Sequence, residues 1–216
     1  MTTQKERYIP ALHFNWLTPL YDPLLKWGMR EEVFKRRLIT QAKIKPGSRV
    51  LDLGCGTGTL TVLVKQTVPE AEVTGLDGDP QVLEIARQKA AQAGIGITWD
   101  HALATALPYP DRSFDRVLSS LVIHHLSGED KLKAFREVYR ILRPGGEFHI
   151  VDFGLPHNVG AWLMSQGMRH LEETKENFNG RLPGMLSEAR FIEIEEMASL
   201  LTIFGPVSLL RANRPL

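Results

Sequence analysis

The stretch "VLDLGCGTGTL", residues 50–60, decides the fold. It begins with apolar residues typical of a buried strand and continues into three glycines at alternate positions, Gly54, Gly56 and Gly58. Glycine tolerates unusual φ and lets another molecule approach the backbone closely. In an open α/β sheet, ligands bind beyond the carboxyl ends of the strands, where the next helix presents free N–H groups. We therefore predict a small-molecule site at this turn.

Short runs rich in β-branched residues alternate with segments of helical period around this turn. The segment 130–142 shows the helical period best, with apolar residues at three- and four-residue steps. Such alternation predicts parallel strands joined by right-handed crossovers, with helices on both faces of the sheet. The predicted strands cover residues 48–54, 71–77, 96–100, 114–120 and 146–153. The fold class is a Rossmann-like α/β open sheet.

The length of 216 residues suits one domain with a sizeable core. Within the single domain 1–216, we expect an N-terminal helical lid segment, 1–47, that includes a helix at 22–45. The cofactor-binding core is 48–153, and "RPGG" at 143–146 is expected to turn into its fifth strand. The remainder, 154–216, is predicted as a helical stretch at 160–178, a short helix, and closing strands at 189–201 and 206–212.

Composition excludes several classes of protein. Lysine and arginine number 26 against 25 acidic residues, so no broad basic field indicates nucleic acid. The single cysteine and a polar start without a secretory layout lead us to expect the cytoplasm. The most apolar late stretch, 198–210, is too short for a membrane span, although peripheral lipid contact stays compatible with the sequence. No cluster has metal-ligand spacing, and the oligomeric state is undetermined.

Two carboxylates discriminate between ligands of the glycine turn. Asp77 closes the second predicted strand 23 residues after Gly54, which suits a ribose diol of a dinucleotide or of another nucleoside. Thr59 stands where a dinucleotide fingerprint has its third glycine, and Asp52 would repel a pyrophosphate. A ligand with an ammonium and a sulfonium would be attracted instead. S-adenosylmethionine carries both, so it is favoured over a nicotinamide cofactor.

Four stretches in order resemble the class I S-adenosylmethionine-dependent methyltransferases, in the branch of the ubiquinone and menaquinone biosynthesis enzymes (methyltransferase type 11 domain). They are "VLDLGCGTGTL", "VTGLDGDPQVLEIARQKA", "ALPYPDRSFDRVLSSLVIHHL" and "FREVYRILRPGGEFHIVDF". The resemblance implies a seven-stranded sheet with an antiparallel last strand, S-adenosylmethionine as cofactor and S-adenosylhomocysteine as product. The cofactor-binding residues it implies are Tyr21, Asp52, Gly54, Gly56, Asp77, Gly78, Ala102, Leu103 and Ser119.

One position departs from the family pattern. Relatives commonly place an aspartate against the adenine amino group, in a Gly-Asp-Ala run where this chain has Ala102, Leu103 and Ala104. Asp100 or His101 is a candidate substitute, and the alternative is that Leu103 packs on the ring while backbone groups read its edge. The loss of one neutral contact would cost on the order of 1 kcal/mol, so binding should survive.

The acceptor side is less determined. If the acceptor loses a proton, His125 or His124 is the candidate base, with His125 favoured because family members more often place a histidine there; packing or loop capping is the alternative for both. Apolar residues of the segments 13–27 and 156–185 suit a small, hydrophobic or lipid-like acceptor as well as they suit an ordinary core. They are Phe14, Trp16, Trp27, Trp162, Met164 and Met168. A non-catalytic S-adenosylmethionine-binding module and a nicotinamide-dependent oxidoreductase are the other hypotheses.

Overall fold

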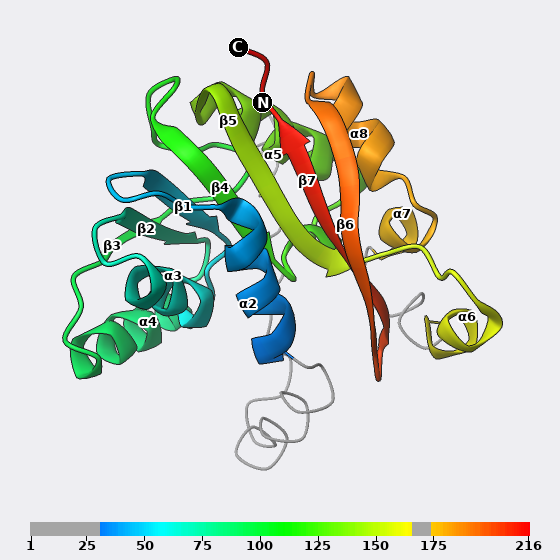
Figure 1. Cartoon of the computed structure of the whole chain (residues 1–216), viewed down its shortest axis with the longest axis horizontal. Coiled ribbons are helices and arrows are strands. Elements are labelled where there is room, and N and C mark those ends of the chain that lie inside the picture. Colours follow the sequence, from blue (N-terminus) through cyan, green and yellow to red (C-terminus); the bar gives the residue numbers. More distant parts are fainter. Residues whose placement is uncertain (1–30, 166–173) are drawn as a thin grey trace, which may run out of the picture.

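The computed structural model describes residues 31–165 and 174–216, and within them a seven-stranded sheet forms the centre of the molecule (Figure 1). The strand order is β3-β2-β1-β4-β5-β7-β6. Strands β1 to β5 pair in parallel, and β7 runs antiparallel between β5 and β6. This confirms the predicted fold class, including the antiparallel last strand. The strands are β1 (Arg49–Leu53), β2 (Glu72–Asp77), β3 (Thr98–His101), β4 (Phe114–Ser120), β5 (Leu142–Phe153), β6 (Ile192–Thr202) and β7 (Gly205–Asn213).

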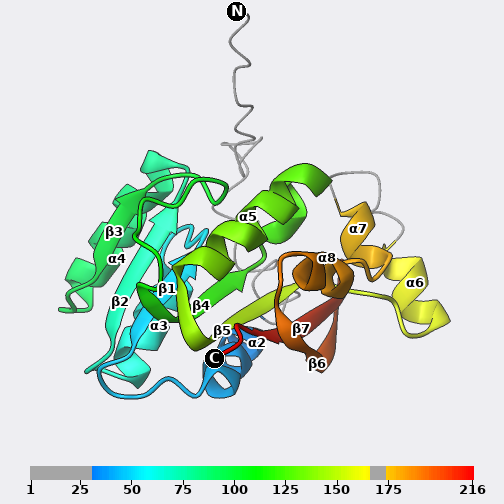
Figure 2. The ribbon, with the colours of Figure 1, turned by 90° about the horizontal axis from the view of Figure 1, so that it is seen from above.

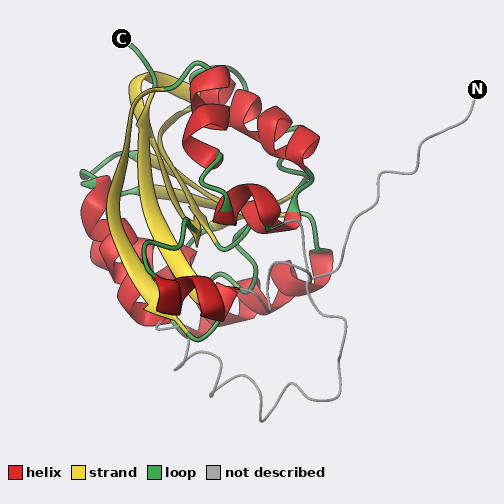
Figure 3. Ribbon diagram, turned by 90° about the vertical axis from the view of Figure 1, so that its right-hand side faces the viewer, coloured by secondary structure: helices red, strands yellow, loops and turns green. Residues whose placement is uncertain are grey.

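Helices cover both faces of this sheet (Figure 3). Seen from above in Figure 2, α5 and α8 lie on one side, and α2 lies on the other. Helices α6 and α7 pack at the carboxyl end of β5 and the start of β7. The helices are α2 (Glu31–Ala42), α3 (Thr59–Thr67), α4 (Pro80–Gln92), the 3₁₀ turn η1 (Ile123–His125), α5 (Gly128–Ile141), α6 (Val159–Ser165), α7 (Lys175–Phe178) and α8 (Leu182–Glu188).

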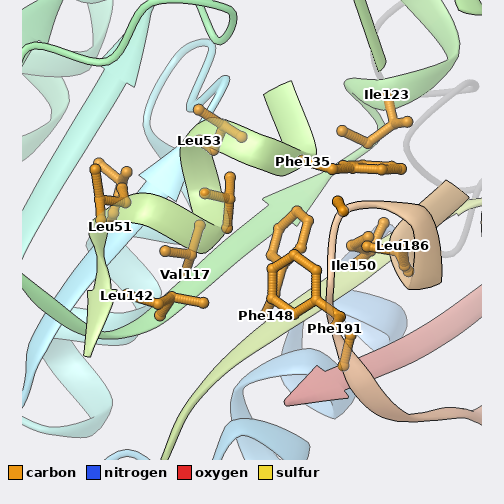
Figure 4. Close-up of a cluster of buried hydrophobic side chains, with 14 of the residues drawn as sticks. Leu51, Leu53, Val117, Ile123, Phe135, Leu142, Phe148, Ile150, Leu186 and Phe191 are labelled. Atoms are coloured by element: carbon orange, nitrogen blue, oxygen red, sulfur yellow. The ribbon is translucent and has the colours of Figure 1, made fainter. Parts of the chain in front are cut away.

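Alternation along β1 divides the core into two clusters and positions the first site residue. Leu51 and Leu53 join the cluster under α5 and α8, which Figure 4 shows with Phe135 and Phe148. Val50 points the other way, into the cluster under α2 and α3. Successive side chains of a strand point to opposite faces, so Asp52 lies on the side of Val50 and meets α3. Each fully buried large apolar side chain contributes roughly 1.5–3 kcal/mol to holding this arrangement.

The predicted elements differ from the observed ones in their boundaries. The helix expected at 22–45 is described from Glu31 and ends at Ala42, followed by Lys43 at φ 44°. The helix at 130–142 starts earlier, because the Ser127 side chain caps it through the N–H of Asp130 at 3.2 Å. Of the stretch 160–178, the structure describes α6 and α7 and not the residues 166–173 between them.

The turn predicted at 143–146 is wrong as a separate element, because this run lies within β5. Leu142 pairs with Phe114 and Glu147 pairs with Arg116, so β5 carries extra residues at this point. Gly145 takes φ +73° there, which a glycine adopts easily. The residues at 143–146 do favour a turn, but strand pairing incorporates them into β5 as a bulge.

Candidate active site

The carboxyl edge of the sheet gathers most of the predicted site residues. Because β1, β2, β4 and β5 are parallel, their carboxyl ends meet at this edge. The four strands bring Asp52, Asp77, Ser119 and Asp152 to it. Three of these four residues were predicted from the sequence, and Asp152 was not.

The three glycines of the turn have different roles. A Cβ on Gly54 would lie 2.4 Å from a methyl carbon of Val122, and one on Gly58 would lie 2.5 Å from the ring of Trp99. Both positions therefore need glycine for packing. Gly56, at φ +52°, would place a Cβ with no atom within 4 Å. Its backbone is the part of the turn that a ligand can approach.

Hydrogen bonds from the turn tie β1 to the end of β2. The N–H groups of Gly54 and Cys55 donate to the Leu76 carbonyl at 2.8 and 2.9 Å. The Gly56 N–H donates to Oδ2 of Asp77 at 2.8 Å, and the Asp79 N–H donates to its Oδ1 at 2.9 Å. Each carboxylate oxygen has a second lone pair, so Asp77 keeps acceptor capacity for the hydroxyls of a ribose.

Asp52 is a buried carboxylate with few partners. It is 1% exposed, and among the described residues its hydrogen bonds come from Thr61, whose hydroxyl donates to Oδ2 at 2.6 Å. Burial raises the pKa of Asp52 from its ordinary 3.8 to about 6, against the hydrogen bond from Thr61 and the charge of Lys35, which lower it. A nearby cation would favour the ionised form. The arrangement therefore suits a ligand with an ammonium group.

A buried hydroxyl at this edge has no hydrogen-bond partner among the described residues. The hydroxyl of Ser119, at the end of β4, is buried and makes no hydrogen bond within the described structure. Buried hydroxyls normally have a partner, and exceptions mark functional positions or a missing ligand. Ser119 pairs in register with Leu53 of β1, so its hydroxyl and the glycine turn belong to the same part of the edge.

The residues expected to lie at the adenine end of the cofactor already form hydrogen bonds within the protein. The ring Nε2 of His101 lies 3.0 Å from the carbonyl of Gly78 and donates to it, because a carbonyl only accepts. Asp100 accepts the Tyr109 hydroxyl at 2.8 Å. The N–H of Ala102 donates to the Asp77 carbonyl at 3.2 Å, so the loop predicted to hold the adenine starts beside Asp77, the predicted ribose ligand.

Leu103 is half-buried in this loop between two alanines that pack against the core, Ala102 and Ala104. Its carbonyl accepts the Ala106 N–H at 3.1 Å, so the loop has its own turn. This placement is compatible with a leucine that covers an adenine ring, and the role stays a prediction.

The two histidines occupy η1, directly after β4. Val122, which precedes η1, is the residue whose side chain fills the space beside Gly54, so η1 lies against the glycine turn. His124 is 5% exposed, and its ring centroid lies 4.0 Å from that of His125. Nδ1 of His124 lies 2.9 Å from Oδ1 of Asp152 on β5.

Asp152 is as buried as Asp52 and far better satisfied. Its Oδ2 accepts the N–H groups of Val122 at 3.1 Å and Ile123 at 2.8 Å, and its Oδ1 accepts the N–H of Phe153 at 2.7 Å. Burial alone would raise the pKa of Asp152, but the charge and hydrogen bond of His124 hold it below its ordinary value. Because an ionised carboxylate only accepts, Nδ1 of His124 carries the hydrogen of this contact.

Asp152 and Asn177 are the site residues that sequence reasoning missed. Asn177, in α7, donates from Nδ2 to Oδ1 of Asp152 at 3.0 Å. A signal for Asp152 was present, because it lies in an apolar run near the end of β5 as Asp52 does near the end of β1. No local pattern marks Asn177, which acts through a contact across 25 residues of sequence.

Several predicted residues cannot be compared with the site, because they lie outside the described residues. They are Tyr21, predicted to bind the cofactor, and Phe14, Trp16, Trp27 and Met168, predicted for the acceptor side. The remaining two are on the surface of α6, where Trp162 is 46% and Met164 is 38% exposed. They are therefore not part of an ordinary core. In residues 31–165 and 174–216, no group of side chains could hold a metal ion, and no helix has the length and apolar character of a membrane span.

Solved structures share this architecture. The YcgJ protein of Bacillus subtilis superposes with a TM-score of 0.68 at 19% identity, over 86% of this chain and 99% of that one. The S-adenosylmethionine-dependent methyltransferase SibL gives 0.70 at 23% identity, over 91% of this chain and 58% of that one. The [4+2]-cyclase SpnF gives 0.69 at 19% identity, over 86% and 81%. These likenesses show the fold alone, a Rossmann-like open sheet.

Sequence comparison defines the branch. The methyltransferase domain family matches residues 50–146. The demethylmenaquinone methyltransferase of Thermus thermophilus is 38% identical over 146 residues, or 66% of this chain and 65% of that protein. Its namesake in Listeria monocytogenes is 31% identical over 173 residues, or 75% and 68%. The chain thus spans about two thirds of the length of these relatives. It belongs to the class I S-adenosylmethionine-dependent methyltransferases, in the ubiquinone and menaquinone biosynthesis branch.

The residues present fit the cofactor of this family, S-adenosylmethionine. Asp52 offers a buried negative charge with few donors, Ser119 an unpaired hydroxyl, and Gly56 an open backbone. Asp77 lies between the turn and the adenine loop, where the ribose would join the two ends of the ligand.

Proposed function

We propose that the chain transfers a methyl group to a ring carbon of a small, hydrophobic quinol, and that His124 takes the proton of the quinol hydroxyl. The observation that carries this proposal is the buried pair of His124 and Asp152 beside the glycine turn. The names of the curated relatives, demethylmenaquinone methyltransferases, support the choice of acceptor.

The chemistry of the donor explains what the protein must add. S-adenosylmethionine, when bound, supplies an electrophilic methyl group on a sulfonium. The enzyme then mainly aligns the two reactants and excludes water. A quinone ring is poor in electrons and a weak nucleophile. A quinol that loses its hydroxyl proton becomes rich in electrons at the neighbouring ring carbon, so a base is useful.

The proposal assigns a role to each residue of the candidate site. Asp52 binds the ammonium of the cofactor, Asp77 binds the ribose hydroxyls, and Gly56 offers its backbone to the methionine end. Ser119 supplies a hydroxyl to the same end. His124 accepts the quinol proton at Nε2. Its Nδ1–H remains hydrogen-bonded to Asp152, and the Asp152 carboxylate stabilises the imidazolium that forms. The ring carbon loses its own proton after methylation, and the oxygen regains one, so the product is again a quinol.

The test measures S-adenosylhomocysteine release with a short-chain demethylmenaquinone, supplied either reduced or oxidised. We expect release with the reduced form and none with the oxidised form, together with a mass increase of one methylene unit in the acceptor. Methylation on oxygen would be distinguished by fragmentation of the product. Release that ignores the redox state of the acceptor, or no release with any quinol, would contradict the proposal.

A further inference from the structure

Asn177 completes the hydrogen bonds of the carboxylate that orients His124. Its Nδ2 donates to Oδ1 of Asp152 at 3.0 Å, and the same oxygen receives Nδ1–H of His124 at 2.9 Å. Asn177 is 1% exposed, so water does not compete for this contact. The N–H of Phe153 donates to this oxygen as well, at 2.7 Å. Donors that share one oxygen weaken each other's hold on it, so Asn177 and His124 are coupled through Asp152.

Docking of α7 does not explain why an asparagine is present. Phe178 is fully buried, and its ring lies 5.3 Å from that of Phe153 on β5. Glu176 forms an ion pair at 3.1 Å with Lys131, which is fully buried in α5. These two contacts already attach α7 to the sheet and to α5.

The carbonyl oxygen of the Asn177 side chain argues against a purely structural role. Its Oδ1 is buried and has no hydrogen-bond partner in the described structure. A buried unpaired carbonyl is unfavourable, and an apolar side chain of similar size would avoid it. Turning the amide over would place Oδ1 against the Asp152 carboxylate and add repulsion. The amide therefore serves Asp152 through Nδ2.

We propose that Asn177 is a positioning residue, which acts through Asp152 to set both the orientation and the proton affinity of the His124 ring. By sharing Oδ1, Asn177 reduces the pull of the carboxylate on the imidazolium. His124 then releases a captured proton more readily than it would if Asp152 lacked the donor from Asn177. The inference rests on the proposed function only for the catalytic use of His124.

Other titratable groups near this pair are placed on several elements. His125 stacks on His124 from η1, Asp152 faces it from β5, and the pair of Lys131 and Glu176 joins α5 to α7 next to Asn177. A control must therefore disturb α7 without touching Asp152. Glu176→Gln does this, because it removes the ion pair and leaves the amide in place.

The experiment follows the ring nitrogens of His124 by long-range ¹H–¹⁵N NMR in the full chain with S-adenosylhomocysteine bound, which requires no acceptor. We expect the Nδ1–H tautomer in the wild-type protein. Asn177→Leu should move the titration midpoint of His124 upward by about half a pH unit, and Asp152→Asn should move it downward. Glu176→Gln should lower the melting temperature and leave the midpoint unchanged.

Asn177→Ala, which adds no bulk, should repeat the upward shift and guards against misfolding of the leucine variant. An unchanged or lower midpoint in the Asn177 variants, or the same shift in Glu176→Gln, would overturn the proposal. Failure of the proposed function gives a different result. In that case His124→Gln keeps its turnover on the quinol, while the midpoint shifts are still seen.

Discussion

Two carboxylates at the same edge of the sheet, Asp52 on β1 and Asp152 on β5, are equally buried at 1% exposure and differ in charge behaviour. Among the described residues, Asp52 is served by Thr61, whereas five donors lie within 3.1 Å of Asp152. The pKa of Asp52 is raised to about 6, and that of Asp152 is lowered. Burial is common to both, so the donors around each carboxylate decide its charge.

The difference teaches what each carboxylate is for. Asp152 is satisfied by the protein, so it stays ionised, caps η1 and fixes His124 whether or not a ligand is bound. Asp52 has one hydrogen-bonding residue, Thr61, among the described residues. Under the proposed function, its buried charge would be a cost in the free protein that a cationic ligand relieves. One carboxylate would then belong to the scaffold and the other to the binding reaction.

The largest effect is expected from the His124 side of this comparison. His124→Gln should lower kcat on the quinol by about 10²-fold or more, because a general base contributes at least that factor. Affinity for S-adenosylhomocysteine, measured by calorimetry, should stay within about twofold, since no contact to the cofactor is assigned to this ring. His125→Gln is the matched control and should cost less. A larger loss in the His125 variant would assign the base to that residue.

Removing the charge of Asp52 should be the next largest change. Asp52→Asn should weaken S-adenosylmethionine binding by roughly 10- to 100-fold, the range of one lost charged hydrogen bond. The same variant should gain relative stability in the free form as pH rises. A raised folded pKa means that the native state holds the proton longer than the unfolded state does, so wild-type stability falls between about pH 4 and 6.

The relative gain for Asp52→Asn should approach about 3 kcal/mol between pH 4 and pH 8, because burial raises the pKa of Asp52 from 3.8 to about 6. Urea unfolding of both proteins without ligand at the two pH values measures it. Equal pH dependence of the two proteins would show that Asp52 is not the strained carboxylate. Asp152→Asn offers the contrast, since it should lose stability at both pH values.

A smaller effect concerns the pH dependence of cofactor binding. Protonated Asp52 carries no charge for the ammonium, so affinity should fall as pH drops through about 6. Between pH 7 and pH 5 the ionised fraction falls by about tenfold, and the dissociation constant should rise by about the same factor. Calorimetry of the wild-type protein checks this, with Asp52→Asn as the control that should lose the pH dependence. A flat wild-type profile would contradict the assignment.

The same contrast shows how far the sequence could predict the site. Asp52, Asp77 and Ser119 follow strand-like runs, so a pattern of strands is enough to bring them to one edge. The pair of His124 and Asp152 joins two strand ends across 28 residues, and Asn177 comes from a helix of four residues. Such contacts depend on how distant segments pack, which local periodicity does not encode. The prediction of a separate turn at "RPGG", residues 143–146, was wrong for a related reason, because strand pairing overrode the local turn preference.

The smallest effect is expected at Leu103, in the loop that follows β3. The family pattern that the chain resembles has an aspartate here, and Leu103→Asp would supply an acceptor for the adenine amino group at the proposed cofactor site. Asp100 already accepts the Tyr109 hydroxyl and His101 already donates to Gly78, so the new carboxylate would not duplicate an existing contact. One added hydrogen bond from a neutral donor, the adenine amino group, is worth on the order of 1 kcal/mol, which predicts S-adenosylmethionine binding tighter by about fivefold. Leu103→Asn keeps the acceptor without the charge and should change the affinity in the same direction.

A large loss of affinity in the Asp variant alone would show that Leu103 faces a dry apolar surface, where an unpaired carboxylate is costly. The loop would then be aligned wrongly with its relatives, and the adenine amino group would have to be held by backbone carbonyls instead.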